Sequence, residues 1–271
     1  MRYPRNLHGM SGDQAFKLAT GSALLFFCLF FLGIILSLLS YTKPVFIVST
    51  LVSHELGQAI MLSLSTATIS TVLSMALGVP AAYALSHSRF RGKEIVDTIL
   101  DLPIVVSPAA LGAALLVFFN TPIGIGIEKH LTRFVFEVPG IVLAQFTVVS
   151  ALSIRLMKST FDGIDYRYEQ VGRTLGCGKW SVFFRITLPM AKNGLVSSCI
   201  LTWARAFGEY SATIILAGAM RPKTETLPVA IFLSLSNADI EKAIAVIFIL
   251  IGVAAIALLV LRAVAKKGYP A

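Results

Sequence analysis

Six apolar stretches, each long enough to cross a lipid bilayer, constrain this chain more than any other feature of its sequence. A membrane-spanning helix needs about 20 predominantly apolar residues. Stretches of this kind run over residues 18–39, 58–85, 99–119, 138–157, 194–219 and 240–261. Helix is the predicted form because backbone groups in lipid must pair within their own segment, and the stretches do not alternate like barrel strands. The sequence therefore predicts an all-α integral membrane protein with six transmembrane helices.

The distribution of charge predicts which side of the membrane each loop occupies. Only 14% of the residues are charged, against 56% hydrophobic ones, and the net charge is +9. If the N-terminus lies inside, 16 of the 23 Lys and Arg residues fall in cytoplasmic segments and six in outer ones, with Arg205 inside the fifth stretch. Cytoplasmic loops carry such an excess. We therefore expect both termini to be cytoplasmic, the lipid bilayer to surround the chain, and nucleic acid not to be a partner.

No segment of the sequence separates from this membrane domain. Residues 1–271 contain no low-complexity linker and no long polar domain, so we expect one transmembrane domain. The first stretch is long enough to span the membrane and no cleavage pattern follows it, which favours an uncleaved helix over a signal peptide.

Residues with catalytic or metal-binding chemistry are sparse. The three cysteines lack metal-ligand spacing, so they predict neither a disulfide framework nor a metal site. They are Cys28, Cys177 and Cys199. A membrane-embedded enzyme would need convergent polar groups at membrane depth, and the histidines fall outside the stretches or at their edges. These are His8, His54, His87 and His130. We expect no catalytic residue and no metal ligand.

The largest polar interruption between stretches is residues 158–192, on the predicted cytoplasmic side. Residues 165–175 can form a short helix with Asp162 or Asp165 as N-cap, and Gly176 and Gly178 follow where a helix ends and the chain turns. A second amphipathic stretch, residues 179–188, brings its apolar side chains to one face: Trp180, Phe183, Phe184 and Leu188. The pattern predicts a compact knob outside the lipid. An amphipathic loop lying on the membrane surface is the alternative.

The residues of this interruption resemble a known motif. Glu169-Gln170-Val171, then Gly176, then Ile186-Thr187-Leu188-Pro189 resembles the EAA loop of ABC-importer permeases, whose pattern reads E-A-A, three residues, G, nine residues, I-x-L-P. Gln170 and Val171 replace the two alanines. The resemblance implies a coupling helix that docks in a cleft of a separate ATPase subunit. It gives the docking and coupling role to Tyr166, Arg167, Glu169, Gln170, Arg173, Thr174, Leu175, Gly176, Ile186, Leu188 and Pro189.

Two later segments narrow the resemblance. Trp203-Ala-Arg205-Ala-Phe-Gly208-Glu209-Tyr-Ser-Ala-Thr213 and Lys223-Thr-Glu-Thr-Leu227-Pro228 are similar to the molybdate/tungstate branch, which is related to the sulfate permeases. This implies the permease subunit of an ATP-driven importer in the cell membrane, with sulfate, thiosulfate or another small oxyanion as alternative cargo. It also implies a homodimer, two cytoplasmic ATPase subunits and an external substrate-binding protein. ATP and Mg would bind the ATPase, so this chain would hold no cofactor and would not be an enzyme. A passive channel or a scaffold, the more remote alternatives, would need no docking motif.

Polar residues inside the stretches are candidates for a gate or pathway. Arg205 and Glu209 are the only clear ionisable pair deep in a stretch, and their spacing puts them on one face of a single helix. A structural pair and a pore-facing gate are both open interpretations. In the stretch 58–85, a ladder of Ser and Thr that includes Ser65 and Thr66 favours close helix packing over a polar path. Ser107 is a further gate candidate, and three prolines predict helix kinks. They are Pro80, Pro103 and Pro108.

Overall fold

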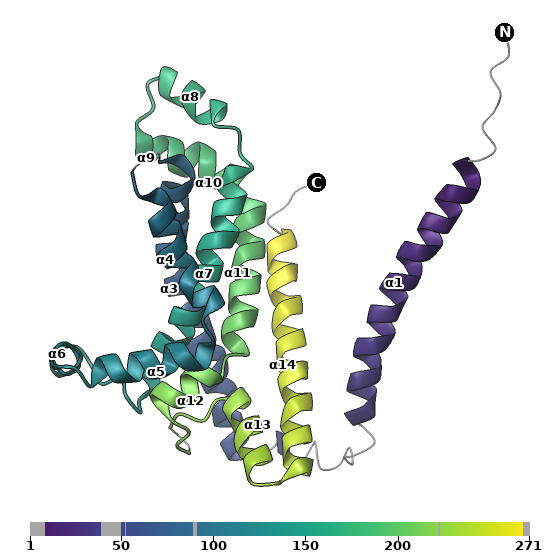
Figure 1. Cartoon of the computed structure of the whole chain (residues 1–271), viewed down its shortest axis with the longest axis vertical. Coiled ribbons are helices and arrows are strands. Elements are labelled where there is room, and N and C mark those ends of the chain that lie inside the picture. The colour runs from purple at the N-terminus through teal and green to yellow at the C-terminus, as the bar shows by residue number, and fades with distance from the viewer. Residues whose placement is uncertain (1–8, 39–49, 52, 89–90, 222, 268–271) are drawn as a thin grey trace.

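The described part of the chain folds into helices without a strand (Figure 1). A computed structural model describes residues 9–38, 50–51, 53–88, 91–221 and 223–267. The long helices are α1 (Gly9–Leu38), α3 (His54–His87), α7 (Val138–Asp162) and α14 (Ile240–Lys267). The shorter elements are α4 (Lys93–Val105), α5 (Pro108–Phe119), α6 (Pro122–His130), α8 (Arg167–Thr174), α9 (Lys179–Val182), the π-helical turn η1 (Phe183–Thr187), α10 (Leu188–Met190), α11 (Lys192–Phe207), α12 (Ser211–Ala217) and α13 (Leu227–Ser236). The predicted all-α fold is confirmed.

Among the described residues, four helices are long and apolar enough to cross a membrane. They are Gln14–Leu38 within α1, the whole of α3 and α7, and Ile240–Ala263 within α14. The pair α4 and α5 passes the same test only if it counts as one span bent by 108°. The chain is therefore a multi-pass membrane protein, whereas the count of six spans stays a prediction. The predicted end of the first span, Leu39, lies outside the described residues.

Two of the six apolar stretches are broken helices, which corrects the sequence prediction. The stretch 99–119 breaks before Pro108, because Ser107 is extended and its hydroxyl accepts the Ala110 N–H at 3.3 Å as the N-cap of α5. The stretch 194–219 breaks at residues 208–210 into α11 and α12. Apolar composition continues through both breaks and does not reveal them.

The helices α3, α7 and α11 pack together in the centre of the fold. Their contacts use small and hydroxyl side chains: Ser70 donates to the Gln145 side chain at 3.0 Å, and Ser153 donates to the Ser74 carbonyl at 3.2 Å. A Cβ atom on Gly78 would lie 2.6 Å from the Ser153 hydroxyl, so α3 and α7 approach closely there. Most of the ladder on α3 is buried: Ser63, Thr66, Ser70, Thr71 and Ser74. The packing interpretation of the ladder is confirmed for these residues.

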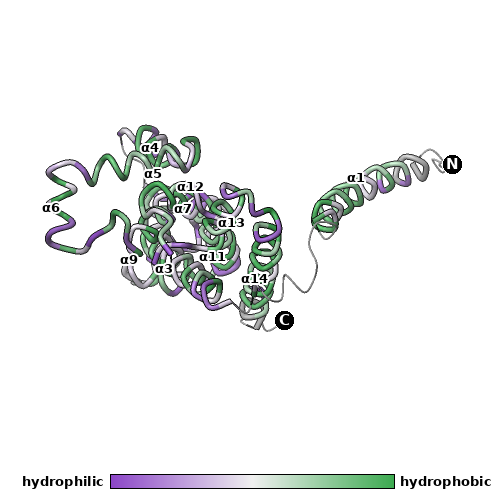
Figure 2. The backbone as a smooth tube through the Cα atoms, turned by 90° about the horizontal axis from the view of Figure 1, so that it is seen from below, coloured by the Kyte–Doolittle hydropathy of each residue, from purple (hydrophilic) through white to green (hydrophobic). Residues whose placement is uncertain are grey.

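Two views show how the long helices are arranged. The start of α1 and the end of α14 both point toward the end of the molecule that carries α8 (Figure 1). Seen from below, α1 stands apart from the packed helices (Figure 2). None of its spanning window is buried against the rest of the chain. An apolar helix without a partner in its own chain must meet lipid or another protein.

Candidate functional site

The predicted knob exists, and we define it as residues 165–187, with α8, a glycine elbow, α9 and η1. It projects beyond the ends of the long helices (Figure 1). The predicted helix 165–175 corresponds to α8, and the Asp165 carboxylate accepts the Arg167 N–H at 2.9 Å. This arrangement favours a knob over a surface-lying loop.

The elbow after α8 is built at Gly176. This residue has a positive φ of 85°, which glycine adopts without the strain that a Cβ atom causes. The Gly176 N–H donates to the Arg173 carbonyl at 3.0 Å, and the Cys177 N–H donates to the Gly172 carbonyl at 3.1 Å. These two bonds form the Schellman motif that ends a helix. Gly178, predicted as part of the turn, has φ −68° and only precedes α9.

Glu169 holds the knob to the membrane helices from inside. Its side chain is buried, and the Tyr83 hydroxyl donates to one carboxylate oxygen at 3.0 Å while Thr187 donates to the other at 2.5 Å. The His87 Nε2 atom lies 3.2 Å from the oxygen that Thr187 contacts. Glu169 thus joins α8 to the end of α3 and to η1. A buried carboxylate with several partners makes such a junction specific.

Aromatic rings surround this junction. The Tyr83 ring lies 4.3 Å from the His87 ring, 5.7 Å from Phe161 at the end of α7, and 4.8 Å from Phe183 in η1. The knob therefore rests on α3 and α7 together. The sequence analysis predicted one shared apolar face for residues 179–188. Instead Phe183 turns inward, whereas Trp180 and Phe184 stack on each other and remain exposed.

The outer surface of the knob carries most of the predicted docking residues. Those exposed are Tyr166, Arg167, Gln170, Arg173, Thr174, Leu175, Gly176 and, just beyond the knob, Pro189. Ile186 and Leu188 are half-buried, and Glu169 faces inward. Leu175 is 79% exposed, and Tyr168 and Val171 add further exposed apolar surface. With Arg167 and Arg173 beside them, this surface is both apolar and cationic.

The motif alignment made above is one residue out of register. Four residues separate Val171 from Gly176 where the pattern allows three, so its first position falls on exposed Gln170 and its second alanine on Gly172. The structure gives a reason for a small residue at Gly172: a Cβ atom there would lie 2.5 Å from the Ile186 terminal methyl group and 3.4 Å from Val182. Gly172 is where α8 packs on η1. The sequence analysis missed this role, although the glycine stood within the motif.

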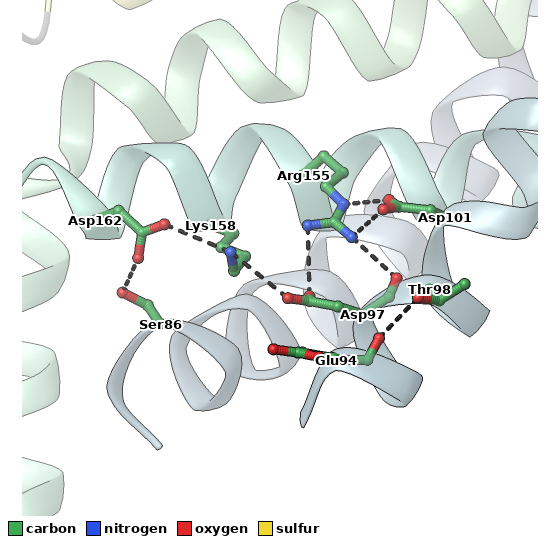
Figure 3. Close-up of polar contacts among 8 residues, drawn as sticks. All are labelled: Ser86, Glu94, Asp97, Thr98, Asp101, Arg155, Lys158 and Asp162. Carbon is green, nitrogen blue, oxygen red and sulfur yellow. Dashed lines mark hydrogen bonds and ion pairs between the residues drawn. The ribbon is translucent and has the colours of Figure 1, made fainter. Parts of the chain in front are cut away.

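A second polar cluster fastens α4 to α7 (Figure 3). We call it the α4–α7 clasp: Ser86, Asp97, Asp101, Arg155, Lys158 and Asp162. The Arg155 guanidinium pairs with both oxygens of Asp101 and donates to the Asp97 carbonyl at 2.9 Å. Lys158 lies 3.8 Å from Asp97 and 3.7 Å from Asp162, to which Ser86 donates at 2.5 Å. All of α4 is described, none of its residues is buried and Leu100 packs half-buried on the core, so charged contacts supply much of what holds this helix.

The clasp adds an ionisable pair that the sequence analysis did not single out, near the ends of two predicted stretches. Asp101 and Arg155 lie inside two predicted spans and pair with each other. The signal was present in the sequence, because Asp97 and Asp101 are four residues apart and share one face of a helix most of whose other positions are apolar.

Arg205 and Glu209 do pair, at 2.7 Å between Nη1 and Oε2, but not within one helix. Arg205 lies in the last turn of α11, and Glu209 lies in the break before α12. The other Glu209 oxygen accepts the Ala212 N–H at 3.1 Å. Each charge therefore sits at the helix end whose dipole it complements, a cation in the last turn of α11 and an anion before α12. The pair builds the break, with the Glu209 side chain only 2% exposed.

The remaining gate candidates, all among the described residues, make their hydrogen bonds within their own helices and not with Arg205 or Glu209. Ser107 is exposed and caps α5. Thr66 is buried and donates to the Leu62 carbonyl of its own helix at 2.8 Å, and exposed Ser65 donates to the same carbonyl at 3.1 Å. The structure therefore gives Ser107 and Thr66 local structural roles.

Comparison with known proteins places these features in a family. The model of the family described as "binding-protein-dependent transport system inner membrane component" matches residues 74–267, which is most of the chain. The chain belongs to this family of ABC-transporter permeases. The matched segment contains both the knob and the clasp.

Individual relatives are permease proteins of transport systems. A probable molybdenum ABC transporter permease protein of Haloferax volcanii is 39% identical over 203 residues, 74% of this permease and 72% of that protein. The molybdate/tungstate transport system permease protein of Thermococcus kodakarensis is 34% identical over 203 residues, 75% of this permease and 77% of its relative.

A solved structure has the same fold. One chain of a bacterial alginate ABC transporter, in complex with an alginate pentasaccharide-bound periplasmic protein, superposes with a TM-score of 0.76. The superposition covers 97% of this permease and 98% of that chain, at 16% sequence identity. At this identity the likeness concerns the fold alone.

Proposed function

We propose that this permease is the membrane subunit of an ATP-driven importer for molybdate or tungstate. Each copy of the chain would be a single transmembrane domain, and two copies would form the pathway. Two ATPase subunits would bind the knobs, and an external protein would deliver the anion. ATP and Mg would bind the ATPase subunits, which perform the hydrolysis. Family membership and the two molybdenum- and tungstate-related permeases support this proposal.

The proposed orientation puts the knob and both termini in the cytoplasm of a cell whose plasma membrane the chain crosses six times. The excess of Lys and Arg on one side supports it. So does the common direction of the start of α1, the end of α14 and the knob. In this arrangement the pair α4 and α5 and the pair α11 and α12 are each one interrupted span.

The observation that carries the coupling role is the two-sided construction of the knob. Its outside is an exposed apolar and cationic surface around Leu175, suited to a cleft with apolar and acidic side chains. Its inside is tied through Glu169 to Tyr83 on α3 and to Thr187 on η1. A movement of the ATPase cleft would therefore displace α3 and α7 with the knob. Closure of the ATPase pair would draw the two knobs together and open the outer side of the pathway.

Co-purification tests this docking. Leu175→Glu puts a charge on the proposed contact, and we expect the ATPase subunit to separate from the permease. Leu131→Glu is the matched control, because Leu131 is 76% exposed against 79% for Leu175 but lies after α6, away from the knob. Glu169→Arg and Gly176→Pro disrupt the support and the elbow of the same surface and should also release the ATPase. Undiminished ATPase binding in the Leu175, Glu169 and Gly176 variants would remove the docking proposal.

Uptake into vesicles tests the cargo. The permease, its ATPase and the binding protein are reconstituted together, and radioactive molybdate uptake is followed in the presence of unlabelled tungstate, sulfate or thiosulfate. We expect tungstate to compete strongly and sulfate weakly. Preferential uptake of sulfate would assign the chain to the sulfate branch instead, and uptake without ATP would indicate a passive channel.

A further inference from the structure

Helix α11 leaves one of its faces uncovered by the rest of the chain. Asn193, Ser197, Leu201 and Arg205 follow one another at intervals of four and are all exposed. Residues four apart share a helix face. The residues on the opposite faces are buried against α3, α7 and α14: Ser198, Thr202, Trp203, Ala206 and Phe207. The four exposed residues therefore form a row along a helix that otherwise lies inside the bundle, and we call it the α11 row.

The α11 row has the wrong composition for a surface in contact with lipid. Three of its four residues are polar or charged. The exposed residues of α14 show what a lipid-compatible face looks like in the same molecule: Ile251, Ile256, Leu259 and Val260. Polar side chains at membrane depth face the interior of an assembly or a water-filled passage. The α11 row is therefore expected to face the interior of an assembly or an aqueous path rather than the lipid.

Arg205, the outermost member of the row, lies about 20 Å along α11 at 1.5 Å per residue. Its side chain is 41% exposed although its partner Glu209 is buried. Both Glu209 oxygens are used, one by Arg205 and the other by the Ala212 N–H. Among the described residues, the Arg205 guanidinium donates to Glu209 Oε2. A guanidinium has five donors, so this partly exposed group can bind a further acceptor.

We propose that the α11 row lines the anion pathway and that Arg205 contacts the passing oxyanion, with Glu209 as its positioning residue. This inference rests on the proposed import of a tetrahedral dianion. Guanidinium groups bind such oxyanions through paired hydrogen bonds. The adjacent carboxylate offsets the positive charge, so the anion is attracted but not trapped. Conduction requires this balance, because a cargo that binds too tightly does not leave.

Cysteine accessibility tests the pathway. The three native cysteines are replaced by serine, and single cysteines are introduced at Asn193, Ser197 and Leu201 in the complete complex in vesicles. We expect water-soluble methanethiosulfonate reagents to label all three, and an anionic adduct at Ser197→Cys to block molybdate uptake. Two controls should remain unlabelled: Val260→Cys on α14, and a variant that retains only Cys199, which lines an apolar groove on another face of α11. Absence of labelling along the α11 row would overturn the pathway assignment and leave the proposed import function unaffected.

The charge at Arg205 is tested by chemical replacement. Arg205→Cys should lower molybdate uptake at least about tenfold, as expected for the loss of a charge-assisted contact. Modification with an aminoethyl reagent should restore part of the uptake, and modification with a sulfonatoethyl reagent should not. Equal uptake with the two adducts overturns the anion contact. A purely structural pair with Glu209 also favours the cationic adduct, but it predicts that the thermal stability of the complex falls and recovers in step with uptake, and that result overturns the anion contact too. ATPase co-purification shows whether the variant has folded. Arg205→Lys, which keeps the charge, must also retain more uptake than Arg205→Gln.

The two levels of the proposal fail differently. If the wild-type complex takes up none of the dianions, the proposed function fails and the anion contact fails with it. If the wild type transports while the α11 row stays unlabelled, only the pathway assignment is lost.

Discussion

Two buried glutamates, Glu169 and Glu209, differ in where their hydrogen-bond partners lie along the chain. The partners of Glu169 are Tyr83 and Thr187, 86 and 18 residues away in the sequence. Those of Glu209 are Arg205 and Ala212, four and three residues away. Glu169 therefore connects separate elements, whereas Glu209 shapes one interruption within its own segment. A long-range junction transmits movement between parts of the molecule, and a local one fixes the course of the backbone.

Neutralising each glutamate tests this contrast and has the largest expected effect. Glu169→Ala leaves the Tyr83 and Thr187 hydroxyls unpaired and should destabilise the protein by about 3 kcal/mol, with loss of ATPase co-purification. Glu209→Ala leaves the buried Ala212 N–H without its acceptor, whereas Arg205 stays partly exposed, so it should cost less, about 2 kcal/mol, and should retain the ATPase. Thermal unfolding in detergent and co-purification measure both. Equal losses in the two variants would erase the distinction.

The α4–α7 clasp extends the comparison to a second long-range junction. Arg155→Leu leaves Asp101 without its cation and Asp97 with Lys158 alone, and should cost about 2 kcal/mol, less than for a fully buried pair because these side chains are partly exposed. Adding Asp101→Leu should recover part of the stability, and the double-mutant cycle measures the coupling. Additive losses would show that the pair does not hold α4. Arg133→Leu, at an exposed loop position, is the control.

Substitutions in the glycine elbow test a feature that depends on local backbone conformation alone. Gly176→Ala forces a Cβ atom into a conformation with positive φ and should cost about 1 kcal/mol. Gly178→Ala is the matched control, because its φ is negative and nothing surrounds it, so its effect should be close to zero. Thermal unfolding of the two variants gives the difference, and a larger loss at Gly178 would contradict the assigned motif.

The smallest effect is expected at Gly172. Gly172→Ala introduces a contact with a terminal methyl group of Ile186, which can shift, and gains about 1 kcal/mol of helix propensity. We expect a net change within about 0.5 kcal/mol and normal ATPase binding. Gly172→Leu cannot fit and should detach α8 from η1. Loss of ATPase binding in the alanine variant would contradict the corrected motif register.

The sequence predicted what depends on local composition. Apolar length located α3, α7 and α14, and the helix signals between Asp165 and Gly176 located α8 and its elbow. The register of the motif was wrong by one residue, since Glu169 was taken as its first position. Nothing local distinguishes a glutamate that faces a partner protein from one that faces Tyr83, because that contact exists only after folding.

Of the two helix breaks, the one at Pro108 was predicted only as a kink, where the structure bends by 108°, and the one at residues 208–210 was missed for a related reason. Pro108 and Gly208 were visible in the sequence, but membrane helices tolerate both residues when neighbours satisfy the backbone. What decides each break is a specific polar contact, the Ser107 cap for α5 and the Glu209 carboxylate for α12. The partners of Arg155 were missed because they lie on another helix, although the spacing of Asp97 and Asp101 pointed to a shared face.

The π-helical turn η1 has a consequence for how this loop can vary in length. A π-helical turn holds one residue more than an α-helical turn of the same span. Deleting a single residue from Phe183–Thr187 would therefore leave an α-helical turn of the same span, and α9 and α10 would keep their relative orientation. The loop between Gly176 and Pro189 can thus lose one residue at this turn without changing the direction in which the knob projects.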